Sequence, residues 1–231
     1  MFRRRLLPLL VVALVVAGIG ILAAGFTSMR SGASAVTGSG ASLTTVVNKQ
    51  HPLSPIDYEP TDLTRVDVAY ASEEAPRLRR EAASAVERMF AAFHEETGEV
   101  MLSRSAYRSH DDQADTYARF ESALGSEAVD ETTARPGYSE HQTGLAIDVG
   151  SDDATCASRD CFAATVQAQW LAKSAWEYGF IIRYPAGQAS VTGYSYEPWH
   201  LRYLGTDLAK TIHFGYGSLE EYYGLPAASD Y

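Results

Sequence analysis

The chain contains an uncharged, largely apolar run from Leu6 to Phe26 near its N-terminus. A helix needs roughly 20 such residues to cross a bilayer. Arg3, Arg4 and Arg5 precede the run directly. Because positive charge collects on the cytoplasmic side of a membrane segment, this arrangement predicts one N-terminal transmembrane helix with the rest of the chain outside.

A cleaved signal peptide is the alternative interpretation of the same segment. Its apolar region is usually only about 7–15 residues, and this run is longer. Ala33-Ser34-Ala35, however, is a small-residue site of the cleavable kind. Both interpretations place the remaining domain outside the cytoplasm, as a membrane-anchored protein or, after cleavage, a secreted one. We therefore expect an anchor or signal segment over 1–28, a flexible Ser/Gly/Ala/Thr-rich linker over 29–45 and one domain over 46–231.

Composition narrows the class of that domain. With 46% hydrophobic and 21% charged residues, the chain is of the ordinary globular type. The formal net charge is −10, and lysine occurs only as Lys49, Lys173 and Lys210. An acidic chain without a basic stripe cannot attract phosphates electrostatically, so we expect no nucleic-acid partner.

Hydrophobic periodicity predicts the order of the secondary-structure elements. Helical spacing favours helices over 78–96, 110–124 and 162–178, whereas short apolar or alternating runs favour strands over 100–102, 145–149, 180–184 and 199–204. Helices come first and strands cluster later. This order predicts an α+β domain with a small antiparallel sheet flanked by helices, rather than a parallel α/β sheet.

The chain contains two cysteines, Cys156 and Cys161. Outside the cytoplasm, the natural interpretation is one disulfide that closes a small loop. Two unpaired thiols are the alternative. A zinc site built on this pair is disfavoured, because the spacing matches no zinc-finger pattern.

A first candidate for chemistry is the segment Ser139 to Asp148. Asp148 closes the apolar run Leu145 to Ile147. A carboxylate that enters a core there is costly unless it is paired or bound to a metal. Gly144 lets the backbone turn after His141, which brings the imidazole near the strand. His141 and Asp148 then either share a cation or form a hydrogen bond with no metal between them, and this segment alone leaves both possibilities open.

A second candidate is the segment Glu197-Pro198-Trp199-His200, expected to be a loop that leads into a strand. His200 would be a third ligand, which gives two His and one Asp around Zn²⁺ with a fourth position open to water. Glu197 would then be the base that takes a proton from that water. The alternative is that His200 is a hydrogen-bonded histidine of the core.

Arg108 lies in a segment, Ser103 to Ser109, between an expected strand and an expected helix. Such loops are common places for functional residues. Its guanidinium would donate to a developing oxyanion or to a substrate carboxylate. The alternative is an exposed surface ion pair, which is common and weak.

The three segments S-A-Y-R-S, S-E-H-Q-T-G-L-A-I-D and E-P-W-H-L-R-Y, in this order, resemble the VanY-type D-alanyl-D-alanine carboxypeptidases. These belong to a wider group of zinc peptidases that includes lysostaphin-type enzymes and the amino-terminal signalling domain of hedgehog. The resemblance covers residues 46 to 215. It implies a Zn²⁺ site on the small sheet, with His141, Asp148 and His200 as the metal ligands. It further implies that Glu197 is the general base and that Arg108 stabilises the oxyanion. Gln113 and Ser139 match positions that bind the substrate.

The function that this resemblance implies is removal of the C-terminal D-alanine from peptidoglycan stem peptides. Three alternatives remain: an L,D-carboxypeptidase or an endopeptidase on the same fold, and a non-catalytic zinc-containing module that binds cell wall. Serine enzymes are excluded by motif. None of the three lysines follows a Ser-x-x-Lys pattern, and no Gly-x-Ser-x-Gly elbow occurs.

Overall fold

The computed structural model describes residues 39–72, 74–152 and 159–231. The predicted membrane segment, residues 1–28, lies outside these residues, and so does Cys156. Cys161 is disulfide-bonded. Within the described part of the chain, no helix has the length and apolar character that a membrane crossing requires.

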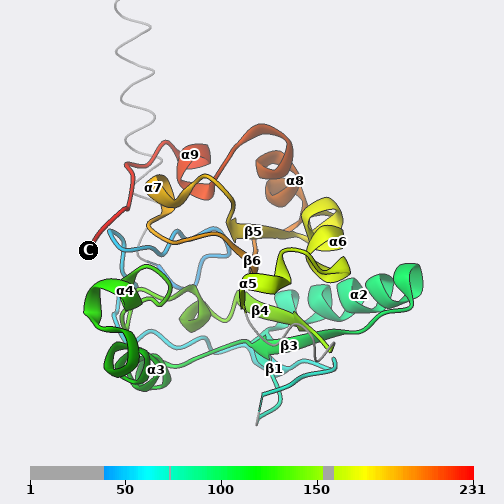
Figure 1. The fold of residues 1–231 in the computed structure, drawn as a ribbon, viewed down its shortest axis with the longest axis horizontal. Helices are drawn as coiled ribbons and strands as arrows, with labels where there is room; N and C mark the ends of the chain where they lie inside the picture. Colours follow the sequence, from blue (N-terminus) through cyan, green and yellow to red (C-terminus); the bar gives the residue numbers. More distant parts are fainter. Residues whose placement is uncertain (1–38, 73, 153–158) are drawn as a thin grey trace, which may run out of the picture. The chain divides into compact units, whose positions relative to one another are not determined.

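A four-stranded sheet organises the domain (Figure 1). Its strand order is β3-β4-β6-β5, and every neighbouring pair is antiparallel. The strands are β3 (Met101–Ser105), β4 (Ala146–Ser151), β5 (Phe180–Tyr184) and β6 (Glu197–Tyr203). A separate pair is formed by β1 (Leu63–Arg65) and β2 (Arg77–Arg79). The α+β class with a small antiparallel sheet is thereby confirmed.

Two helices match the periodicity of the sequence closely. Helix α2 runs over Arg80–Thr97 and α3 over His110–Leu124. The side chain of Ser109 accepts a hydrogen bond from the backbone N–H of Asp112 and so fixes where α3 begins. Outside the segment 159–178, the further helices in the described residues are α4 (Ser126–Asp130), η1 (Glu140–Thr143), α7 (Ala189–Thr192), α8 (Thr206–Gly215) and α9 (Leu219–Tyr223).

The single helix expected over 162–178 is wrong. The structure has three short pieces there: α5 (Arg159–Phe162), α6 (Val166–Ser174) and η2 (Ala175–Tyr178). Thr165 accepts a hydrogen bond from the backbone N–H of Ala168, which starts a new helix in the middle of the expected one. Val166, the first residue of this new helix, is 42% exposed.

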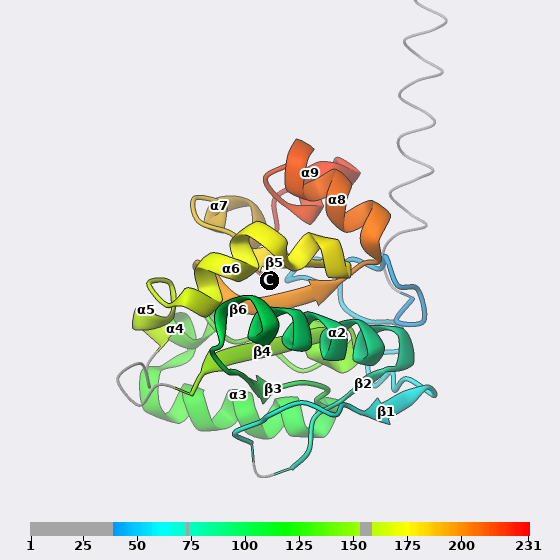
Figure 2. The same ribbon diagram turned by 90° about the vertical axis from the view of Figure 1, so that its right-hand side faces the viewer.

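The two faces of the sheet differ in character. Helices α2 and α6 cover one face, where they form the main apolar core with Ile147, Val149 and Leu201 (Figure 2). Because side chains alternate along a strand, Asp148 and His200 point to the opposite face. Packing against α2 and α6 therefore fixes which side of the sheet presents the polar side chains.

The residues just before the expected domain boundary at 46 are attached to the domain. The guanidinium of Arg79 donates to the carbonyl oxygen of Ala41 at 2.9 Å. The guanidinium of Arg202 donates to the carbonyl oxygens of Leu43 and Thr45 at 3.0 and 2.8 Å. The packed domain therefore extends further toward the N-terminus than the sequence pattern indicates.

Candidate metal centre

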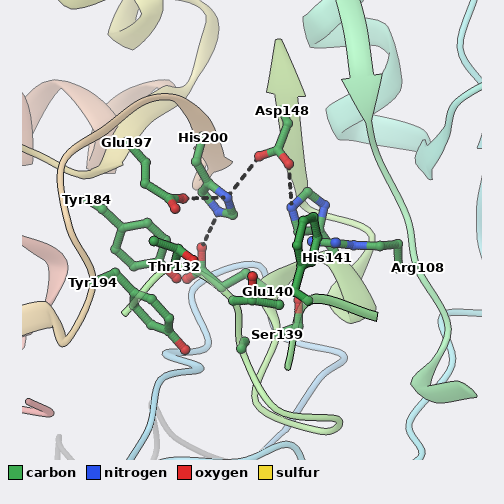
Figure 3. A pocket seen from close by; sticks show the side chains of 13 residues that line it. Arg108, Thr132, Ser139, Glu140, His141, Asp148, Tyr184, Tyr194, Glu197 and His200 are labelled. Atoms are coloured by element: carbon green, nitrogen blue, oxygen red, sulfur yellow. Dashed lines mark hydrogen bonds and ion pairs between the residues drawn. The ribbon is translucent and has the colours of Figure 1, made fainter. Parts of the chain in front are cut away.

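His141, Asp148 and His200 lie together on the polar face of the sheet (Figure 3). Asp148 in β4 and His200 in β6 are direct cross-strand partners, which places their side chains next to each other. His141 comes from η1, the short helix that leads into β4. One nitrogen or oxygen atom from each residue lies within 4.8 Å of the other two, and all three residues are buried.

Gly144 makes the turn that delivers His141 to this place. Its φ of +68° lies in the left-handed region, and its N–H donates to the carbonyl oxygen of His141 at 3.1 Å. A Cβ atom at this position would lie 2.9 Å from a methyl carbon of Leu63. Both the backbone conformation and the close neighbour require glycine here.

Each imidazole is held by the ring nitrogen that faces away from the centre. His141 donates from Nδ1 to the carbonyl oxygen of Ala106 at 2.6 Å, so its Nε2 has no proton in the neutral ring. His200 faces Glu140 Oε2 with Nε2 at 3.4 Å. The remaining nitrogens, His141 Nε2 and His200 Nδ1, lie 3.4 and 3.1 Å from the carboxylate oxygens of Asp148. Metal-binding histidines usually have this second partner.

The electrostatics of the two histidines differ. Burial lowers the pKa of His141 to about 4, and the nearby charge of Arg108 acts in the same direction. Burial also opposes the charged form of His200, but its contacts with Asp148 and Glu140 outweigh this and raise its pKa to about 9. For Asp148, burial is outweighed by the two imidazoles, and its pKa is well below the ordinary value. At neutral pH, His141 and Asp148 are therefore already in the forms that bind a metal.

The residues present fit a zinc ion. His141 Nε2 and Asp148 Oδ1 are buried, and although they lie 3.4 Å from Asp148 Oδ2 and 3.1 Å from His200 Nδ1, neither forms a hydrogen bond of good geometry with a described residue. Leaving such atoms unsatisfied is costly, and a cation would satisfy both. Two imidazole nitrogens and one carboxylate oxygen are a donor set that zinc takes, and three protein ligands are typical of a catalytic site with an open position.

Glu197 is placed beside this centre by an irregularity in the sheet. It is the first residue of β6, not part of a loop as the sequence suggested. His200 is three positions further along the chain, so a regular strand would turn the two side chains to opposite faces. The pairing of β5 with β6 shifts register between Ile182 and Tyr184, and Glu197 Oε2 lies 3.8 Å from His200 Nδ1. Such bulges commonly re-aim a side chain next to a site.

A pocket opens over the centre, and two other predicted residues line it. Arg108 and Ser139 are among its lining residues, together with the aromatic side chains of Tyr184 and Tyr194. Gln113 does not line the pocket. Its side chain is fully buried, and its amide donates to the carbonyl oxygen of Ala134, a residue of the pocket wall, at 2.7 Å. Gln113 is thus placed to shape the pocket through Ala134.

The sequence interpretation missed Glu140. This carboxylate is completely buried and lies 2.8 Å from Arg183 and 2.7 Å from Arg202. Burial would raise its pKa, but Arg202 and Arg183 outweigh that effect and hold the pKa far below the ordinary range. A signal was present, since both arginines lie within apolar strand segments, where a buried guanidinium requires an acidic partner.

Comparison with known proteins shows which protein family this chain resembles. Residues 75–206 match the family described as "VanY: D-alanyl-D-alanine carboxypeptidase". The putative carboxypeptidase YodJ of Bacillus subtilis is 42% identical over 181 residues, which covers 77% of this chain. This chain spans 66% of the length of YodJ, slightly less than two thirds.

Solved structures have the same fold. The LdcB LD-carboxypeptidase is 42% identical with a TM-score of 0.72, and the match covers 79% of this chain and 86% of that one. A mutant of the vancomycin-resistance D,D-pentapeptidase VanY, solved in complex with Zn(II), is 30% identical with a TM-score of 0.59, and the match covers 78% and 98%. The match to the family and the geometry of the site agree, and the chain belongs to the VanY family of D-alanyl-D-alanine carboxypeptidases.

Proposed function

We propose that this protein is a zinc-dependent D-alanyl-D-alanine carboxypeptidase that removes the terminal D-alanine from peptidoglycan stem peptides. The observation that carries the proposal is the convergence of one nitrogen or oxygen atom each from His141, Asp148 and His200 within 4.8 Å, with Glu197 Oε2 3.8 Å from His200 Nδ1. The Zn(II) complex of the VanY relative and the description of the family support it. His141, Asp148 and His200 are the proposed ligands.

Zinc bound there lowers the pKa of water toward about 7 and polarises a carbonyl group. The other roles belong to side chains of this chain. Glu197 accepts the proton of the attacking water and then delivers it to the leaving amine. Arg108, on the pocket wall, donates to the carbonyl oxygen as negative charge develops on it. A purely structural zinc site would need no such carboxylate beside it, which argues against a non-catalytic binding module.

A product assay with defined stems tests this function. We expect a pentapeptide stem that ends in D-Ala-D-Ala to yield a tetrapeptide and free D-alanine, as measured by mass spectrometry, and a zinc chelator to abolish the reaction. Trimming of a tetrapeptide to a tripeptide, with the pentapeptide left intact, would indicate an L,D-carboxypeptidase instead. Cleavage within a cross-linked stem would indicate an endopeptidase, and no cleavage of any stem would leave only the binding module.

Zinc binding should release a proton. Near pH 6, His200 in the metal-free protein carries a proton because its pKa is raised to about 9, whereas His141, with a pKa of about 4, does not. A metal can bind only the deprotonated nitrogen, so about one proton should leave per zinc bound. Calorimetric titration in buffers of different ionisation enthalpy measures this number. The zinc affinity should also rise as the pH approaches 9, and a pH-independent affinity without proton release would contradict the assignment of His200.

We further propose that the enzyme acts outside the cytoplasm, where its stem-peptide substrate is found. The uncharged run Leu6 to Phe26 would attach it to the membrane, or direct its secretion if the segment is cleaved. In this scheme residues 1–28 are the anchor, the residues that follow it are a tether, and the catalytic domain, expected over 46–231, also includes the residues from about 41 that are hydrogen-bonded to it. Western blotting of membrane and medium fractions from the source cells, with size comparison, distinguishes the anchored form from the cleaved one.

A further inference from the structure

The buried carboxylate of Glu140 contacts His200 on the side of the ring that faces away from the metal centre. Glu140 precedes His141 directly in η1, yet its side chain contacts the other histidine, His200 (Figure 3). Its Oε2 lies 3.4 Å from His200 Nε2, at the long end of the hydrogen-bond range. This is the ring nitrogen that faces away from Asp148.

The two oxygens of Glu140 have separate partners. Oε1 accepts from Arg183 Nε at 2.8 Å and from Arg202 Nη1 at 2.7 Å. Two charged donors on one oxygen fix the rotation of the carboxylate, because turning it away would leave the buried N–H groups of Arg183 Nε and Arg202 Nη1 without this acceptor. Oε2 is thereby directed at His200.

The arginines are themselves held in place. Arg183 forms a two-pronged ion pair with Glu220 of α9, at 2.9 and 2.6 Å. Arg202 donates to the backbone carbonyls of Leu43 and Thr45. These anchors lie outside residues 75–206, the part of the chain that matches the family. A rigid support behind His200 is therefore built from both flanks of the matched region.

We propose that Glu140 is a positioning residue that makes His200 a metal ligand through Nδ1. By accepting the Nε2–H of His200, the carboxylate keeps a proton on the far nitrogen, so that Nδ1, the nitrogen beside Asp148, is the one that gives up its proton to bind the metal. The inference rests on the proposed zinc function of this centre. Outer partners of this kind commonly affect metal affinity by 10–100-fold when removed.

The substitution Glu140→Gln tests the role with almost no change in volume. Gln has one oxygen, which stays with the two arginines, and its amide N–H₂ then faces His200 Nε2. Two donors cannot pair, so the imidazole must move its proton to Nδ1, the atom that should bind the metal. We expect zinc affinity, measured by competition with a chromophoric chelator, to fall by about 10–100-fold.

Glu220→Gln is the matched control. Glu220 is as completely buried and pairs with the same Arg183, but it has no contact with His200 among the described interactions. If Glu140 acts only as part of the ion network, both variants should lose stability and zinc affinity together. If it positions His200, only Glu140→Gln should lose zinc affinity and shift the visible absorption spectrum of the Co²⁺-loaded protein.

A measurement on the unaltered protein keeps the inference testable even if Glu140→Gln does not fold. In the zinc-loaded wild type, ¹H–¹⁵N correlations of the histidine rings should show His200 with its proton on Nε2 and the metal on Nδ1. A metal on Nε2, or equal zinc affinity in Glu140→Gln and the wild type, overturns the positioning role. Failure of the wild type to bind zinc overturns the proposed function itself, so the two failures are distinguishable.

Discussion

Glu197→Gln should lower kcat for release of D-alanine by about 10²–10⁴-fold, the range expected when a general acid–base is removed. The amide has nearly the same shape but cannot accept the proton of water. Because Glu197 is not one of the three clustered ligands, zinc content should stay at the wild-type level. Steady-state kinetics on a pentapeptide stem, with metal analysis of the same sample, measures both quantities.

Glu177→Gln provides the control for this substitution. It makes the same chemical change on an exposed residue of η2, which does not line the pocket. Its kcat and zinc content should equal those of the wild type. If Glu197→Gln retained zinc and most of its activity, another group would have to be the base, and the assignment of Glu197 would be wrong.

The parts of the fold that the sequence predicts are those governed by a single local pattern. Helix α2 has an apolar stripe at 3.6-residue spacing, and residues of that stripe, such as Met89 and Phe93, are fully buried. The segment 162–178 also has helical spacing, but Thr165 satisfies a backbone N–H locally and starts a second helix. Periodicity does not register such a capping interaction, so the break was missed.

Some residues of the candidate site could be predicted from local sequence patterns, and others could not. His141, Asp148 and His200 stand out because imidazole and carboxylate side chains interrupt apolar or glycine-bounded segments, and the structure brings them together. Glu140 did not stand out, since its partners Arg183 and Arg202 are distant in the sequence and meet it only when β5 and β6 pair. Its role depends on tertiary packing. The position of Glu197 likewise depends on a register shift that no local pattern reveals.

His141→Ala should abolish both zinc binding and activity. The substitution removes one of the three proposed ligands, so hydrolysis of the pentapeptide stem should fall to background. Zinc at about 1,000 times its Kd should stabilise the wild type by roughly 4 kcal/mol, and this gain should vanish in the variant. Urea unfolding of both proteins with and without zinc measures this zinc-dependent gain in the free energy of unfolding.

The zinc-dependent difference is the decisive quantity, because His141 also has a structural role. Its Nδ1 donates to the carbonyl oxygen of Ala106, and loss of a buried hydrogen bond alone costs about 1–3 kcal/mol whether or not zinc is present. His110→Ala is the control: its imidazole is partly exposed and does not line the pocket, so both the zinc gain and the activity should persist. An unchanged zinc gain in His141→Ala would show that the ion is held elsewhere, because a destabilised fold cannot imitate that result.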